Sequence, residues 1–479
     1  MLTDACRDIS RTDERKIDMI RINRIKKMIT GLKGCIQIPV FVICLVIPVL
    51  VNAQVAGSAM QGNETTAVLF DDFFLNRSLR IDYFLAGNNQ EENVFFRDIR
   101  EEPYYGGPHN DLVSLMNTGT YRYCLYDSAS GKLLYARGFC SIFQEWRGTA
   151  EAKVLPRAFP MAAVMPFPKK TVNFIIEKRS YETGVYGKLF EMRIWPDDYF
   201  IRKDSIHRYK VEKLLYSGEP ANHVDVAFLA EGYTETEMPK FVEDARAMSD
   251  YFMSVEPYSN FRNRFNFYAI MSPSDESGIT IPGKEIYANT SIHSNFYTFG
   301  MDRYLTSFDV KAIYDIAANV PYDAIFVLVN SKRYGGGGFY NLYSEGTVDN
   351  QYSRTVAIHE FGHSFAGLAD EYYNAEITYS DYYNLKTEPW EENITTNVNI
   401  ESKWKAMIPS GVPIPTPREA KYQDVTGMFE GGGNVAKGIY SPAMNCRMKS
   451  NESKDFCPVC RQAITRMILY YSEQVIDDK

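Results

Sequence analysis

The chain has 479 residues, of which 45% are hydrophobic and 23% are charged. This balance excludes a wholly disordered chain and a fibrous repeat, and the length predicts two or three domains. Acidic residues outnumber basic ones by 60 to 52, for a net charge of −8. A broad basic face that binds nucleic acid is therefore not expected.

The first 53 residues have the pattern of an export signal. Basic side chains precede an apolar run from Ile36 to Val51, and Ala53 closes a small-residue cleavage site. The run is short and contains two prolines, which disfavours stable membrane insertion after cleavage. We expect a signal peptide over 1–53, with Met28 as an alternative start. The protein is then exported, whether secreted, periplasmic or held at the cell surface.

Five cysteines follow the predicted signal, and export permits disulfides among them. Cys124 and Cys140 flank a predicted hairpin and are candidates for a cross-link between its strands. Cys446 is a candidate partner for Cys457 or Cys460, and one thiol is left over. The Cys-x-x-Cys pair at 457–460 lacks a second such pair or a histidine pair, which disfavours a zinc knuckle. The pairing stays open.

Residues 54–205 predict an N-terminal β-sandwich domain. Segments such as YRYCLYD and TVNFIIEKRSY alternate or run apolar between turn residues, and no helical period interrupts them. The sequence favours a supporting role for this domain over a dedicated binding module.

Residues 215–479 predict an α/β domain. Buried strands are expected at Val224–Leu229, Phe265–Met271 and 324–330, with a helix that opens at Thr234 in a capping box. The segment YGGGGF after the third strand lacks the Lys-Ser/Thr of a phosphate-binding loop. It is typical of a flexible loop or an edge strand beside a cleft.

The sequence TVAIHEFGHSFAGLADEY predicts a metal site. His359 and His363 are four residues apart, so a helix places both imidazoles on one face, as a tetrahedral Zn²⁺ requires. Glu360 is placed to take a proton from water at the metal. Gly367 is expected to end the helix.

A third protein ligand is expected after this glycine. Asp370 is the favoured residue, and Glu371 or a glutamate on a later helix are the alternatives. The Gly-then-Asp pattern resembles that of metzincins, although Gly367 comes one residue later than usual. Metzincins also place a methionine under the metal, and Met448, or alternatively Met444, in YSPAMNCRM is the candidate. Tyr372 and Tyr440 are candidates for stabilising an oxyanion.

Together, HEFGHSFAGLADEY, the preceding YGGGGFYN and the tail YSPAMNCRM…FCPVC resemble the immunoglobulin-A metallopeptidase family, a secreted metzincin-like group. The resemblance spans about 215 to 470, and the β-rich part is similar to that family's N-terminal domain. It implies zinc at His359, His363 and Asp370, with Glu360 as the catalytic base. It does not imply the substrate, so cleavage of immunoglobulin A stays open.

We therefore expect a secreted zinc endopeptidase that acts on protein or peptide substrates. The alternatives are a zinc-containing surface binding protein and a metal hydrolase that acts on a non-peptide amide. The sequence leaves the oligomeric state and any additional metal undetermined.

Overall fold

The computed structural model describes residues 68–113, 117–203, 208–373 and 382–472, which belong to one compact unit. The predicted signal peptide at 1–53 lies outside these residues. Within the described ranges, no helix is both long and apolar enough to cross a membrane.

The N-terminal part is β-rich and consists of two antiparallel sheets, with strand orders β2-β1-β5 and β4-β3-β6-β7. Its strands are β1 (Phe74–Gly87), β2 (Glu92–Glu102), β3 (Tyr121–Asp127), β4 (Leu133–Phe139), β5 (Arg157–Pro168), β6 (Val172–Arg179) and β7 (Tyr186–Ile194). A short helix, α2 (Phe70–Phe73), precedes β1, and another, α3 (Ile142–Trp146), lies between β4 and β5. The sequence did not reveal α3, because five residues are too few to display a helical period.

The register of β3 against β4 keeps Cys124 and Cys140 apart. Cys124 lies opposite Ala136, so Cys140 is four positions further on, about 13 Å along the strand. Both thiols are free. The candidate cross-link between them is therefore absent from the structure.

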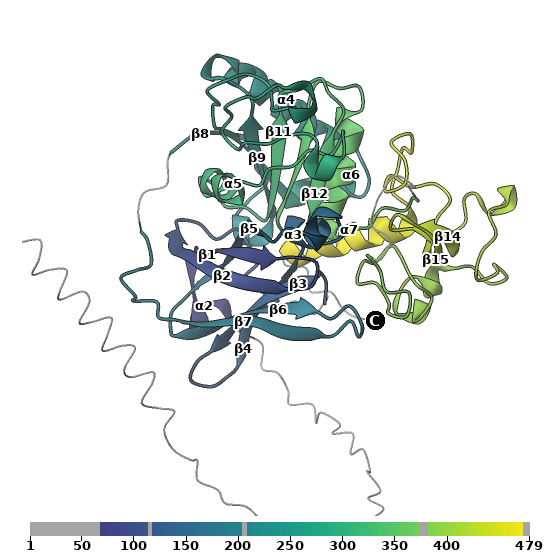
Figure 1. Ribbon diagram of the computed structural model, residues 1–479, viewed down its shortest axis with the longest axis horizontal. Helices are drawn as coiled ribbons and strands as arrows, with labels where there is room; N and C mark the ends of the chain where they lie inside the picture. The colour runs from purple at the N-terminus through teal and green to yellow at the C-terminus, as the bar shows by residue number, and fades with distance from the viewer. Residues whose placement is uncertain (1–67, 114–116, 204–207, 374–381, 473–479) are drawn as a thin grey trace, which may run out of the picture. The chain divides into compact units, whose positions relative to one another are not determined.

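The C-terminal part contains a six-stranded sheet of order β12-β13-β11-β9-β10-β8. Its strands are β8 (Lys210–Leu215), β9 (Val224–Glu231), β10 (Phe265–Met271), β11 (Ala324–Val329), β12 (Gly336–Phe339) and β13 (Tyr343–Thr347). The four inner strands run parallel and both edge strands are antiparallel to their neighbours. The three strands predicted from the sequence are confirmed, and the glycine-rich segment forms the edge strand β12 (Figure 1).

Four longer helices and a hairpin complete the C-terminal part. They are α4 (Met238–Phe252), α5 (Val310–Ala317), α6 (Ser353–Ala366), α7 (Pro458–Tyr471) and the strands β14 (Phe429–Gly432) and β15 (Val435–Ser441). The predicted capping box is present, and the Thr234 N–H donates to Glu237 Oε2 at 2.8 Å. It opens a short 3-10 turn, and α4 begins at Met238.

The six-stranded sheet is buried on both faces. Val226 and Phe228 of β9 pack into a core with α4, α6 and α7, whereas Ala227 and Leu229 pack into a core with α5 and the N-terminal sheets. This alternation follows from the two-residue period of a strand. The N-terminal part therefore covers one face of the sheet whose edge strand lies beside α6.

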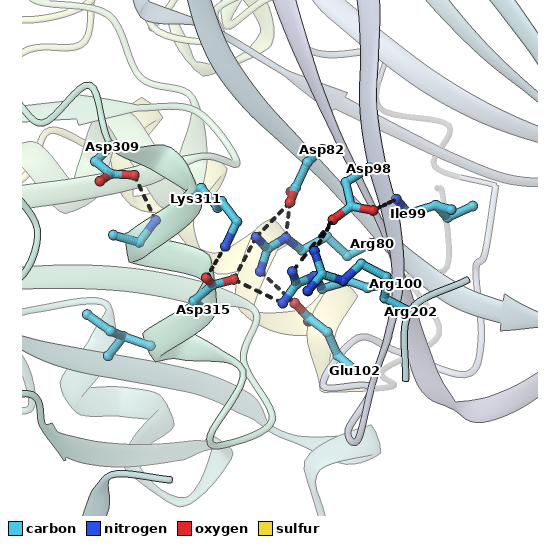
Figure 2. A network of polar contacts seen from close by, with 12 residues as sticks. Arg80, Asp82, Asp98, Ile99, Arg100, Glu102, Arg202, Asp309, Lys311 and Asp315 are labelled. Atoms are coloured by element: carbon cyan, nitrogen blue, oxygen red, sulfur yellow. Dashed lines mark hydrogen bonds and ion pairs between the residues drawn. The ribbon is translucent and has the colours of Figure 1, made fainter. Parts of the chain in front are cut away.

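A buried charge network joins the two parts (Figure 2). The Arg80 side chain of β1 is 0% exposed and binds Asp82 at 2.6 Å. It also reaches Glu102 of β2 at 3.0 Å and Asp315 of α5 at 2.9 Å. The ion pairs with these carboxylates offset part of the cost of burying the Arg80 guanidinium.

Candidate active site

Helix α6 presents the two predicted histidines on one face and ends at the predicted glycine. Gly367 has φ +62° and ψ +31°, the left-handed conformation that turns a chain away from a helix. A Cβ at this position would lie 2.6 Å from the Trp390 ring. Glycine is thus required here both by conformation and by space.

This turn brings Asp370 back to the histidines. Asp370 Oδ1 lies 3.1 Å from His359 Nε2 and 3.4 Å from His363 Nε2. The two Nε2 atoms are 3.0 Å apart. Three atoms that are typical metal ligands therefore converge on one point.

Backbone carbonyls orient both imidazoles. His359 Nδ1 lies 3.1 Å from the carbonyl of Arg447, and His363 Nδ1 lies 2.5 Å from that of Leu368. A carbonyl can only accept, so each Nδ1 carries the proton and each Nε2 presents a lone pair to the shared point. This arrangement is the usual outer support of a metal-binding histidine.

The charges at this point fit a cation. Asp370 Oδ1 is buried and has no hydrogen-bond partner, while Oδ2 accepts from Asn434 Nδ2 at 3.2 Å. Burial raises the pKa of Asp370, but the histidines outweigh it and hold that pKa well below its ordinary value. Burial lowers the pKa of His363, but the Asp370 carboxylate more than offsets this and raises it to about 9. The buried Asp370 carboxylate thus carries a negative charge that a metal ion would offset.

Glu360 faces the same space from the next position of α6. Burial raises its pKa, and the two neighbouring histidines act in the opposite direction. Strand β12 packs against it without side chains, because a Cβ at Gly336 would meet Glu360 Cγ at 2.9 Å and one at Gly338 would meet the Glu360 carbonyl oxygen at 2.3 Å. The glycine run therefore permits close packing of strand and helix.

The two methionine candidates differ in position. Met448 is fully buried beneath α6, with its Sδ 2.8 Å from where a Cβ of Gly362 would lie. Its carbonyl accepts from the Glu371 N–H at 2.8 Å. Met444 is partly exposed. Of the two, Met448 lies under the histidine helix.

A cavity of about 520 Å³ opens onto His359, Glu360, His363 and Asp370. Tyr372 lines it, whereas Tyr440 is not among the lining residues. Strand β12 and the N-terminal part also contribute to the wall, the latter through Cys140 and Glu145 of α3. The N-terminal part therefore helps to form the candidate site as well as supporting the sheet.

Family comparisons agree with this arrangement. A family model described as IgA Peptidase M64 matches residues 212–424 and 418–468, and one described as Peptidase M64 N-terminus matches residues 69–189. Together they cover well over half of the chain. The chain belongs to the IgA peptidase M64 family. A search of curated proteins found no match.

Membership in the M64 family makes the chain a peptidase by family, and its substrates are therefore proteins or peptides. The family's N-terminal model coincides with the β-rich part, and its peptidase model spans all four residues of the candidate site. This confirms the resemblance inferred from the sequence.

Two side chains of this M64 chain lie where the sequence gave no indication. Glu145 reaches the cavity from α3, more than 200 residues before the histidines, and Tyr304 OH donates to its carboxylate. Burial raises the pKa of Glu145 to about 7, against the effect of that hydrogen bond. Neither a motif nor a spacing marks it, because only the tertiary fold brings α3 to the site.

Glu371, the alternative third ligand, points away from the histidines. Its Oε1 lies 3.0 Å from Cys460 Sγ and 3.6 Å from Cys457 Sγ, on the far side of the turn from Asp370. Neighbouring residues of an extended segment project to opposite sides. Asp370 and Glu371 thus belong to different clusters.

Proposed function

We propose that this M64 peptidase is a secreted, zinc-dependent endopeptidase with a metzincin-like catalytic domain. His359, His363 and Asp370 would hold the zinc, and Glu360 would be the general base. The observation that carries the proposal is the convergence of three ligand atoms beside a buried glutamate in one cavity. The orphaned Asp370 Oδ1 supports it, because a buried carboxylate oxygen is costly without a partner.

When bound, a zinc ion supplies Lewis acidity to a water molecule and to the scissile carbonyl. Glu360 accepts the proton of the attacking water and delivers it to the leaving amine. The raised pKa of Glu360 suits this exchange, since a base must also be able to release its proton. Met448 supports α6 from below, and Tyr372 is the tyrosine placed to donate to an oxyanion.

The edge strand β12 is the proposed platform for the substrate backbone. It is the last strand of the sheet and lines the cavity, an arrangement that lets an extended peptide add as a further strand. An isolated bridge between Tyr304 and Gly336 already occupies its N-terminal end. The substrate would therefore pair with the residues from Gly337 onward.

Substitution Glu360→Gln tests the proposed base. It keeps the size of the side chain but removes its basicity, so peptide cleavage should fall by about 10²–10⁴-fold while bound zinc is retained. Cleavage of a peptide library is measured beside the zinc content, with the exposed Glu243→Gln of α4 as the control. Undiminished cleavage by purified Glu360→Gln would refute the mechanism. If the wild type cleaves only a parallel panel of glycans, the result would instead favour a hydrolase that acts on a non-peptide amide. If it binds zinc but hydrolyses nothing, the result would favour a zinc-containing binding protein.

A further inference from the structure

A second cluster of metal-ligand side chains lies behind the candidate active site. We call it the sulfur cluster, and it consists of Cys446, Cys457, Cys460 and Glu371. Each of these side chains is at most 4% exposed. We propose that the sulfur cluster binds a structural zinc ion, separate from the one proposed at the histidines.

The distances within the cluster suit a tetrahedral ion. The Sγ atoms of Cys446 and Cys460 lie 3.8 Å apart, and Glu371 Oε1 lies 3.6 Å from Cys457 Sγ and 3.0 Å from Cys460 Sγ. With zinc–sulfur bonds of about 2.3 Å and zinc–oxygen bonds of about 2.0 Å, a tetrahedron separates two sulfurs by about 3.8 Å and a sulfur from an oxygen by about 3.5 Å. The four ligand atoms all lie within 4.8 Å of one another.

Backbone amides around the sulfurs favour thiolates. The Cys457 N–H donates to Cys446 Sγ at 3.2 Å, and the Cys460 N–H donates to Cys457 Sγ at 3.5 Å. Cys457 also caps the N-terminus of α7, where the helix dipole stabilises a thiolate. These are the groups expected around sulfurs that bind a metal.

Glu371 supplies the independent argument for a cation. Its side chain is 0% exposed and its Oε2 has no hydrogen-bond partner, while Oε1 accepts from Asn393 Nδ2 at 3.2 Å. A disulfide would use two of the three sulfurs and leave Oε2 of this buried carboxylate without a hydrogen-bond partner, with the attraction of nearby Lys449 offsetting only part of its charge. A divalent ion compensates the carboxylate and uses all three sulfurs at once.

This geometry revises the argument against a zinc knuckle at 457–460. The missing half of the site comes from Cys446, in the preceding loop, and from Glu371, beside the proposed catalytic ligand Asp370. A sequence search for paired Cys-x-x-Cys motifs cannot find such a set, because Cys446 stands alone and Glu371 lies 86 residues before Cys457.

The position of the cluster gives the ion a second role. It would tie the segment that carries Asp370 to the loop 446–448, whose Arg447 carbonyl orients His359 and whose Met448 lies under α6. The sulfur-cluster zinc would thus position the catalytic ligands without touching the substrate. Loss of the cluster should weaken zinc binding at the histidines by about 10–100-fold, the usual effect of losing outer support.

X-ray absorption on the full chain tests the site independently of the proposed function. The variant His359→Ala/His363→Ala removes the histidine site, so the zinc that remains should show a shell of sulfur neighbours at about 2.3 Å. Cys460→Ser in wild-type background should lose that shell, whereas Cys124→Ser, a buried cysteine elsewhere, should keep it. Absence of sulfur-bound zinc from the double-histidine variant would overturn the proposal, whether or not the wild type cleaves peptides.

A second measurement needs no variant and so does not depend on mutant folding. The wild-type chain is alkylated under denaturing, chelating and non-reducing conditions and then analysed by peptide mass spectrometry. The proposal expects Cys446, Cys457 and Cys460 all to be alkylated. Recovery of any two of them as a disulfide-linked peptide would overturn it.

Discussion

At the scale of single residues, the glycines of β12 show what a sequence pattern can and cannot specify. The run YGGGGF indicated an edge strand or loop beside a cleft, and β12 is such a strand. The reason for each glycine was not visible in the sequence. For Gly336 and Gly338 it lies in the close contact with α6, a helix that begins 17 residues after Gly336. For Gly337 it lies in the contact with the Leu305 carbonyl oxygen, which is 2.6 Å from where a Cβ would be.

Substitution Gly338→Ala should separate β12 from α6. The added Cβ would lie 2.3 Å from the Glu360 carbonyl oxygen, so the backbone must shift. We expect a loss of about 1–3 kcal/mol in the free energy of unfolding, together with reduced cleavage. Urea unfolding measures the first effect. Gly187→Ala in β7, where a Cβ meets nothing within 4 Å, is the control and should be neutral. Equal stability of the two variants would contradict the packing argument.

A buried glutamate predicts how stability depends on pH. Burial raises the pKa of Glu345 on β13 from 4.5 to about 8, and the nearby Glu231 adds to the rise. Protonated Glu345 therefore stabilises the fold fully when the pH is below the pKa that this side chain has in the unfolded chain. This stabilisation is lost as the pH rises through about 8, the pKa in the folded chain. Between those values the wild type should lose up to about 1.4 kcal/mol per pH unit relative to Glu345→Gln, whose side chain does not titrate. Urea unfolding from pH 5 to pH 8 checks this, and parallel pH curves for both proteins would contradict it.

At the scale of elements, the sequence predicted those features that depend on residues close together in the chain. The strands β9, β10 and β11, the capping box before α4 and the glycine that ends α6 follow from local sequence patterns. Helix α3 and its Glu145 did not follow, because a helix of five residues is stabilised by tertiary packing. The association of Glu371 with three cysteines likewise did not follow from the sequence, because it depends on the direction that the chain takes after Gly367.

Gly367→Ala tests whether the end of α6 positions the third ligand. The variant is strained by its positive φ, and its Cβ would also meet the Trp390 ring at 2.6 Å. Gly131→Ala shares the strain, with φ +72°, but its Cβ meets nothing within 4 Å. Each should lose about 1–2 kcal/mol from conformation. Gly367→Ala should lose more, and it alone should bind zinc more weakly in a competitive chelator titration. Unchanged zinc affinity would show that Asp370 is positioned by other contacts.

At the scale of the whole molecule, the sequence suggested two domains with boundaries at 54–205 and 215–479, and these boundaries stay a prediction. The structure shows that residues of both parts share one hydrophobic core. It also shows Arg137 of β4 donating to Tyr471 OH of α7 at 2.8 Å. Such contacts could not be predicted from the sequence, because no motif around either residue indicates its distant partner.

Arg80→Met tests the network that joins the two parts. Removing the guanidinium takes away the basic partner that Asp82 and Glu102 share, whereas Asp315 keeps its ion pairs with Lys311 and with Arg100. We expect a loss of about 3–5 kcal/mol, as for other buried pairs that lose one partner. Thermal unfolding is compared with that of Arg193→Met, an exposed arginine on β7. A similar melting temperature for both variants would mean that the network contributes little.

The central claim is that a zinc ion sits between His359, His363 and Asp370. The most direct measurement is an anomalous difference map at the zinc absorption edge from crystals of the purified enzyme. A zinc ion at this position should give a peak about 2.0–2.2 Å from both Nε2 atoms and from a carboxylate oxygen of Asp370. A crystal grown with zinc that shows no peak at this point, or a peak that excludes Asp370, would contradict it.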